Sequence, residues 1–168
     1  MNKWSDYYKK KLVDPVHLLK KVNDIRAQNK TIATLNGSFD LLHAGHLHMI
    51  FEASQTADCL IVALNSDSSI KQYKSESRPI IPLEERLQMM SALEFVDYVT
   101  WFEETDPRRL LAEIKPDVHV NGSEYGENCL ESEIVRSNGG KIHIVQLIPG
   151  LSTSGIIKKL QQEMTPCV

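Results

Sequence analysis

Five short runs rich in β-branched and apolar residues alternate along this chain with stretches of helical periodicity, and this alternation is the strongest constraint on its fold. A helix between two strands acts as a crossover, so consecutive strands lie parallel in one sheet and the helices cover its two faces. The pattern therefore predicts a doubly wound α/β domain with a five-stranded parallel sheet. The expected strands cover residues 31–36, 59–65, 96–102, 117–121 and 141–147.

The expected helices follow from apolar residues that recur every three to four positions. Between the strands they cover residues 44–56, 82–94, 107–114 and 131–137. A polar and charged stretch at residues 71–78 (KQYKSESR) instead predicts an exposed, mobile loop after the second strand.

A further helix is expected ahead of the first strand. Pro15 suits its first turn, and apolar residues follow at helical spacing at Val16, Leu19, Val22 and Ile25. We therefore expect residues 1–30 to form a leading helical segment, residues 31–163 to form the main domain, and residues 164–168 to form a C-terminal tail.

The composition is that of one globular domain. The chain has 168 residues, of which 42% are hydrophobic and 24% charged, and these values argue against a disordered or disulfide-stapled chain. Its formal net charge of -3 provides no basic surface for nucleic acid. The cysteines Cys59, Cys129 and Cys167 are odd in number and lack metal-ligand spacing. Because we find neither a membrane span nor a signal peptide, we expect a cytoplasmic protein.

The segment most informative about function is NGSFDLLHAGHLHMI at residues 36–50, which begins where the first strand ends and continues into a helix. Ligands of open α/β sheets bind outside the carboxyl ends of the strands. Gly37 and Gly45 allow the backbone to pass close to a ligand, and the free N–H groups of the helix start favour an anion. His43 and His46 lie three apart on one helix face, where both can donate to one phosphate.

A second polar segment, Leu151-Ser152-Thr153-Ser154, precedes the helical run GIIKKL. Ser152 and Thr153 can cap that helix and also direct hydroxyl and N–H groups at a phosphate. On its own such a segment is more often a simple helix cap. Together with the histidine turn it predicts the second half of a phosphate site.

The spacing G-x-F-D-x-x-H-x-G-H at residues 37–46 resembles the signature of the cytidylyltransferase-like superfamily of nucleotidyltransferases, and the segment at residues 151–154 resembles that family's I-S-T-T motif. Over residues 12–160 the chain is most similar to the D-glycero-D-manno-heptose 1-phosphate adenylyltransferases. The collinear matches include LNSDSSIKQYK, SRPIIPLEERLQMMSALEFVDYV and KPDVHVNGSEY. The chain departs from this pattern at Asn121, where the heptose enzymes usually have lysine. The resemblance implies one Rossmann-like nucleotidyltransferase domain.

The resemblance also implies roles for individual residues. His43 and His46 match the phosphate-binding pair that stabilises the transition state, with Lys74 as a further catalytic cation. The positions that match nucleotide contacts are Gly37, Ser38, Phe39, Asp40, Gly45, Asn65, Asp67, Arg86, Glu124, Tyr125, Ser152, Thr153 and Ser154. For Lys74 and Arg86 the alternative is a solvated surface charge. For Asn65 and Asp67 the alternative is a plain turn at the end of a strand.

The activity that the resemblance implies is attack of a sugar phosphate oxygen on the α-phosphate of ATP, with release of pyrophosphate. Heptose 1-phosphate would give ADP-heptose for the lipopolysaccharide core. Mg²⁺ would be held mainly by triphosphate oxygens, with no metal site made by the protein alone, and the enzyme would be a homodimer. One alternative is a cytidylyltransferase acting on glycerol 3-phosphate or a similar phosphorylated alcohol. A second is a catalytically inactive nucleotide-binding regulatory module.

Overall fold

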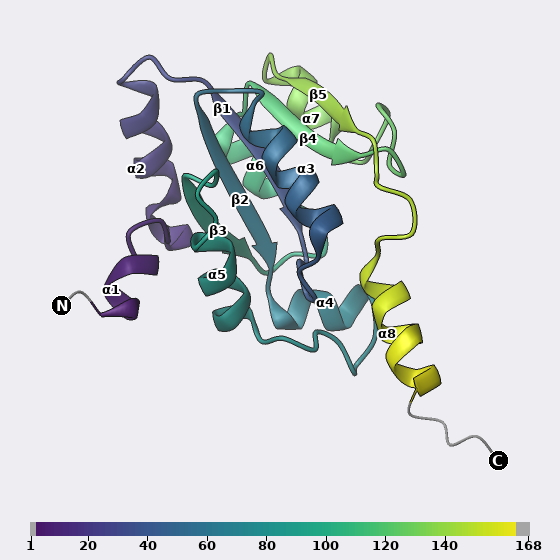
Figure 1. Cartoon of the computed structure of the whole chain (residues 1–168). Helices are drawn as coiled ribbons and strands as arrows, with labels where there is room; N and C mark the ends of the chain where they lie inside the picture. The colour runs from purple at the N-terminus through teal and green to yellow at the C-terminus, as the bar shows by residue number, and fades with distance from the viewer. Residues whose placement is uncertain (1–2, 164–168) are drawn as a thin grey trace.

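A computed structural model describes residues 3–163 and has a five-stranded sheet in which every pairing is parallel (Figure 1). The strand order is β3-β2-β1-β4-β5, so the chain builds the sheet outward from β1 in one direction and then in the other. This confirms the predicted fold class. The strands are β1 (Ile32–Gly37), β2 (Cys59–Asn65), β3 (Tyr98–Phe102), β4 (Val118–Gly122) and β5 (Lys141–Val145).

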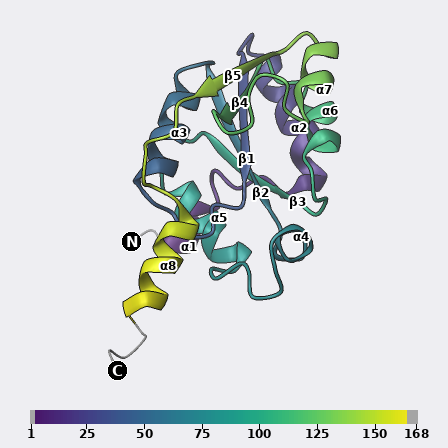
Figure 2. The same ribbon diagram turned by 90° about the vertical axis from the view of Figure 1, so that its right-hand side faces the viewer.

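Helices cover both faces of the sheet (Figure 2). One face carries α3 (Ala44–Ser54) and α5 (Leu83–Ser91), and the other carries α2 (Pro15–Arg26), α6 (Arg108–Ile114) and α7 (Ser132–Ser137). Two more helices, α4 (Asp67–Tyr73) and α8 (Thr153–Glu163), lie at the carboxyl end of the central strands (Figure 1). A short first helix, α1 (Trp4–Tyr8), precedes α2.

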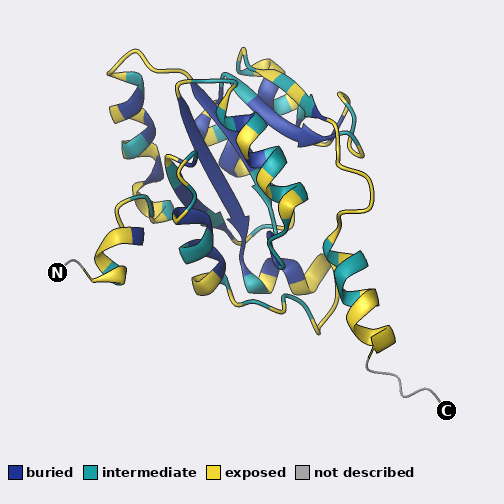
Figure 3. Ribbon diagram, viewed as in Figure 1, coloured by how far each residue is buried: buried dark blue, intermediate teal, exposed yellow. Residues whose placement is uncertain are grey.

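The sheet is the buried centre of the molecule (Figure 3). All seven residues of β2 are buried, as expected for a central parallel strand with helices on both sides. Side chains of alternate strand residues enter two apolar layers. Leu35 and Leu64 pack toward α3 and α5, whereas Ile32 and Ile61 pack toward α2 and α6. Each such fully buried side chain stabilises the fold by roughly 1.5–3 kcal/mol.

The helix expected ahead of the first strand is α2, which begins at Pro15 and packs onto this core. In α2 the buried residues are Leu18, Val22 and Ile25, whereas Val16 is 81% exposed and Leu19 is 54% exposed. Of the four apolar residues that indicated the helix, Val22 and Ile25 therefore lie on its buried face and Val16 and Leu19 do not. Since the buried residues of α2 share a cluster with strand residues, the leading segment adds to the main core; the domain division at residue 30 stays a prediction.

Helix α4 is the element that the sequence analysis missed. Residues 71–77 are exposed as predicted, but residues 71–73 belong to α4 and not to a loop. The Oγ of Ser66 accepts a hydrogen bond from the amide of Ser69, which caps the helix, and Ile70 is fully buried beneath it.

At the carboxyl end of the chain, none of the described residues of α8 is buried. The predicted tail at residues 164–168 lies outside the described residues. Within residues 3–163, no helix combines the length and apolar character that crossing a membrane requires.

Candidate active site

A cavity of about 160 Å³ lies between the ends of β1 and β4. These neighbouring strands are the point at which the sheet changes its direction of growth, and ligands of open α/β sheets bind at such switch points. The β1–α3 turn, α4 and the start of α8 gather at this end of the sheet (Figure 1). The predicted site residues that line the cavity are Gly37, Ser38, Phe39, His46, Lys74, Glu124, Tyr125 and Thr153.

The two histidines of the β1–α3 turn stack on each other, with ring centroids 3.8 Å apart. His43 is the N-cap of α3, and its Nδ1 accepts a hydrogen bond from the amide of His46 at 3.3 Å. A neutral imidazole whose Nδ1 accepts must carry its proton on Nε2, so His43 has a donor available for a ligand. In His46, Nδ1 is buried and has no hydrogen-bond partner within the described chain.

The surroundings of both imidazoles favour their neutral forms. Burial, together with the neighbouring His43 and Lys74, lowers the pKa of His46 to about 4. Burial also lowers the pKa of His43. The Nζ of Lys74 lies 2.9 Å from the Oγ of Ser38, so Lys74 brings a positive charge to the β1–α3 turn. A bound polyphosphate would therefore meet hydrogen-bond donors and one lysine charge.

Gly45 allows the starts of α3 and α8 to approach closely. A Cβ at this position would lie 3.0 Å from the His43 ring and 3.1 Å from the Cβ of Leu151, the first residue of the second predicted segment. In that segment the Oγ of Ser152 accepts a hydrogen bond from the amide of Gly155, and Thr153 lines the cavity. Ser152 is thus a helix cap, and the first turns of α3 and α8 both contribute to one cavity, through His46 and Thr153.

Phe39 has the left-handed backbone conformation, with φ of 45°, which is uncommon for a residue other than glycine. Its ring is buried against His46, with the two ring centroids 5.4 Å apart in an edge-on arrangement. Such backbone strain persists where the surrounding structure holds the residue in place, as it often does at functional sites. Gly37, Ser38 and Phe39 of this turn all line the cavity.

Asp40, a predicted nucleotide contact, has its side chain directed elsewhere. Its carboxylate is fully buried and accepts from the Nε of Arg78 at 2.5 Å and from the amides of Ile80 and Ile81 at 2.8 Å. Burial alone would raise its pKa, but these hydrogen bonds and the charge of Arg78 outweigh burial and lower it. Asp40 therefore joins the segment after α4 to the β1–α3 turn, and Arg78, at the end of the predicted loop, is part of this contact.

Arg86, another predicted phosphate contact, is buried behind the cavity. Its guanidinium donates to the carbonyl oxygens of Ser38, Asn65 and Ile81 at 2.6–2.9 Å, and to the Asp67 carboxylate at 2.6 Å. The side chain is 0% exposed. Arg86, Asn65 and Asp67 do not line the cavity, so in this structure they join the ends of β1 and β2.

Two polar side chains of the cavity lining, Asn36 and Asn121, were missing from the predicted set. Each is followed by glycine at the end of a strand, Asn36 in β1 and Asn121 in β4, and these strands are neighbours. A repeated Asn-Gly pair at the ends of two buried strands was the available signal. Glu124 and Tyr125 follow directly, and burial raises the pKa of the Tyr125 phenol, with the charges of Glu124 and Glu131 adding to this.

Sequence comparison decides the family. A family model described as Cytidylyltransferase-like matches residues 34–163, which include the histidine turn, the cavity and α8. The chain belongs to the cytidylyltransferase-like family. This places the α3 histidines and the α8 start within a nucleotidyltransferase domain, in agreement with the family resemblance of the two motifs.

Relatives of this cytidylyltransferase-like chain include the bifunctional protein HldE of Salmonella arizonae, which is 46% identical over 143 residues, and HldE of Salmonella newport with the same values. The match takes up 84% of this chain and 30% of the relative. The chain therefore spans less than a third of the length of the curated relatives it matches.

Solved structures agree on the fold. A lipopolysaccharide core biosynthesis protein from Thermoplasma volcanium matches with a TM-score of 0.58 and 29% identity, over 71% of this chain and 97% of that one. A pantoate-beta-alanine ligase from Francisella tularensis also has a TM-score of 0.58, at 18% identity over 88% of this chain and 72% of that one. The ligase supports the fold alone.

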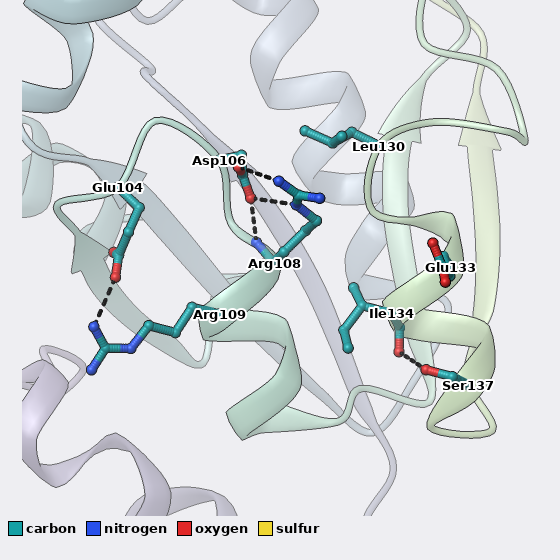
Figure 4. Close-up of a pocket in the computed structure, with 8 residues that line it drawn as sticks. All are labelled: Glu104, Asp106, Arg108, Arg109, Leu130, Glu133, Ile134 and Ser137. Carbon is teal, nitrogen blue, oxygen red and sulfur yellow. Dashed lines mark hydrogen bonds and ion pairs between the residues drawn. The ribbon is translucent and has the colours of Figure 1, made fainter.

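A larger surface cavity of this cytidylyltransferase-like domain offers no free cation for an anion among the described residues that line it. The cavity between the start of α6 and α7, of about 540 Å³, is larger than the one beside His46 (Figure 4). Its two arginines are already paired with acids, Arg108 with Asp106 and Arg109 with Glu104. The predicted site residues are absent from its lining. The residues that line the β1–β4 cavity, and not its volume, therefore identify it as the candidate site.

Metal-binding groups are sparse around the site. Among residues 3–163, no group of three or more histidine, cysteine, aspartate or glutamate side chains is arranged to hold a metal ion. Glu124 is the one acidic residue among the described residues that line the cavity. This donor set fits a magnesium ion that arrives on a triphosphate, because Mg²⁺ keeps several waters and is usually held by phosphates and one or two carboxylates.

Proposed function

We propose that this chain transfers AMP from ATP to a sugar phosphate, with D-glycero-D-manno-heptose 1-phosphate as the preferred acceptor, and releases pyrophosphate to give ADP-heptose. The observation that carries the proposal is His46, which lines a cavity together with Lys74 and Thr153 at the start of α8, with the ring of His43 stacked on it from outside the cavity lining. The motif resemblance to heptose 1-phosphate adenylyltransferases and the similarity to HldE support the substrate.

The reaction needs no covalent enzyme intermediate. An oxygen of the sugar phosphate attacks the α-phosphorus of ATP, the new P–O bond forms, and the bond from the α-phosphorus to the bridging oxygen breaks with its electron pair leaving on pyrophosphate. Negative charge spreads over the α-phosphate oxygens in the transition state. The imidazole N–H groups of His43 and His46 and the ammonium of Lys74 stabilise that charge, while the two helix starts position the triphosphate.

We propose that Mg²⁺ accompanies the triphosphate and is held mainly by its oxygens, with Glu124 as the carboxylate within the cavity lining. The bound ion would neutralise part of the charge on the phosphates. Because Mg²⁺ prefers oxygen ligands, the imidazoles of His43 and His46 would act on phosphate directly and not through the metal. The homodimer and the cytoplasmic location that the sequence analysis expects stay predictions.

A panel of substrates tests the proposal. The four common nucleoside triphosphates are each combined with heptose 1-phosphate or with glycerol 3-phosphate, and pyrophosphate release is measured. The proposal expects release with ATP and heptose 1-phosphate well above every other pair. Highest activity with CTP and glycerol 3-phosphate would favour the cytidylyltransferase alternative. No release with any pair, together with triphosphate binding, would favour the inactive regulatory module.

Lys74→Ala is expected to lower kcat/KM for nucleotidyl transfer by about tenfold, because a charge-assisted contact to phosphate is lost. The matched control is Lys71→Ala, which removes an exposed lysine on α4 outside the cavity. That control should leave the rate within about twofold of wild type. Steady-state pyrophosphate release by the three proteins is the measurement. Equal rates for both variants would mean that Lys74 is a solvated surface charge.

A further inference from the structure

The side chain of Asn121, at the end of β4, is held by two neighbours from the following loop. Asn121 lines the cavity and is 5% exposed. Its Nδ2 donates to the Oε2 of Glu131 at 3.5 Å, and the Glu131 side chain is itself buried, with the residue 8% exposed. Asn121 and Glu131 also hydrogen-bond to the thiol of Cys129, whose pKa is raised by burial.

This arrangement determines which way the amide of Asn121 points. A carboxylate is an acceptor only, so the NH₂ group of Asn121 must face Glu131. The carbonyl oxygen lies at the other end of the planar amide. Because the same side chain lines the cavity, that oxygen is the polar atom it offers to a ligand.

A second hydrogen-bond acceptor, the carboxylate of Glu124, lies on the same wall of the cavity. The carboxylate of Glu124 lies over Gly122, in the position that a Cβ at Gly122 would take. Glu124 also lines the cavity. The β4 side of the cavity therefore presents a carbonyl oxygen and a carboxylate, whereas the β1–α3 side presents imidazoles and amides. A ligand group that meets the Asn121 oxygen has to be a hydrogen-bond donor, whereas the Glu124 carboxylate can also take the magnesium ion proposed above.

We propose that Asn121 is a specificity-determining residue whose carbonyl oxygen accepts a hydrogen bond from an N–H or O–H group of the substrate, and that Glu131 is the positioning residue that fixes its amide. The inference rests on the proposed nucleotidyl transfer. The donor has two possible sources, the exocyclic amine of the nucleobase or a hydroxyl of the sugar phosphate. A site built around a fixed acceptor rejects an analogue that brings a second acceptor, because both groups then stay unpaired.

The test compares substrate ratios in wild type and Asn121→Ala. The nucleobase arm uses ATP against inosine triphosphate, which carries an oxygen where adenine has its amine. The sugar arm uses heptose 1-phosphate against mannose 1-phosphate, which lacks the terminal hydroxymethyl group. We expect one of the two kcat/KM ratios to fall by about tenfold in Asn121→Ala, while the other stays within twofold, and the arm that changes identifies the source of the donor.

Two variants of Glu131 test whether this residue positions the Asn121 amide or only stabilises the fold. Glu131→Gln keeps an oxygen that can accept from Asn121 and is expected to retain most of the wild-type ratio. Glu131→Ala leaves the amide free to rotate and is expected to lower the same ratio that Asn121→Ala lowers. If Asn121→Ala does not fold, Asn121→Ser takes its place, because serine keeps a polar group there without a carbonyl.

Binding measurements test the role of Asn121 independently of the transfer rate. Calorimetric titration of ATP, inosine triphosphate and both sugar phosphates gives the same two ratios as dissociation constants. A wild type that binds ATP but transfers nothing would contradict the proposed function and would leave these ratios to decide the role of Asn121. Both ratios within twofold of wild type in the Asn121 variant, by rate and by binding, would overturn the inference.

Discussion

His46→Ala is expected to lower the rate of nucleotidyl transfer by about a hundredfold or more, the usual effect of removing one preorganised donor to a transition state. The ring of His46 lines the cavity, stacks on His43 at 3.8 Å, and has a buried Nδ1 without a partner in the described structure. Its hydrogen-bonding capacity is thus available for a ligand and is not used by the fold. The measurement is kcat from pyrophosphate release, with thermal unfolding followed in parallel.

His48→Ala is the matched control for this prediction. It removes another imidazole from α3, but from a position that does not line the cavity. Its kcat should stay within about threefold of wild type. If His46→Ala also stays within threefold, with unchanged melting, the stacked pair is a packing feature of the turn and has no role in transfer.

Arg86→Ala is expected to lower the free energy of unfolding by about 3–5 kcal/mol, the range for breaking a buried charged network. The resemblance implies a phosphate contact, but the guanidinium is 0% exposed and donates to three backbone carbonyls and to Asp67. Removing it leaves buried acceptors unpaired at the ends of β1 and β2. Urea unfolding measures the change.

Two further arginine variants sharpen this prediction. Arg86→Lys should not restore stability, because one ammonium group cannot reproduce the planar fork that reaches four acceptors. Arg109→Ala removes an arginine whose side chain is 77% exposed in a surface ion pair and should change stability by less than about 1 kcal/mol. A stable Arg86→Ala protein that has lost triphosphate affinity would contradict the structural role and support phosphate contact.

The sequence predicts the sheet well because buried parallel strands have a strong local signature. The run CLIVALN of β2 is buried at every position, and its predicted bounds agree with the structure. Helix α4 lacks such a signature. Its seven residues include one apolar residue that is fully buried, Ile70, and the helix depends on its Ser66 cap and on packing against the sheet. Local periodicity therefore could not separate it from the polar loop that follows.

The motif located the site but could not determine where each side chain points. His46 and Thr153 line the cavity as predicted, because the start of a helix fixes their direction. Asp40 belongs to the same motif, yet it binds Arg78 and two amides from a segment about forty positions away. Its partners come from tertiary structure. Helix α2 shows the same limit, since helical spacing at Val16 and Leu19 predicts the helix but the buried face includes Leu18 instead.

The direct test of nucleotidyl transfer is the fate of labelled phosphate. ATP labelled at the α-phosphate and ATP labelled at the γ-phosphate are incubated separately with the protein, Mg²⁺ and heptose 1-phosphate, and the products are separated. The account predicts that the α-label appears in a nucleotide sugar and the γ-label in pyrophosphate, in equal amounts. Transfer of the γ-label to the sugar phosphate, or its release as inorganic phosphate with no α-label in a sugar product, would contradict it.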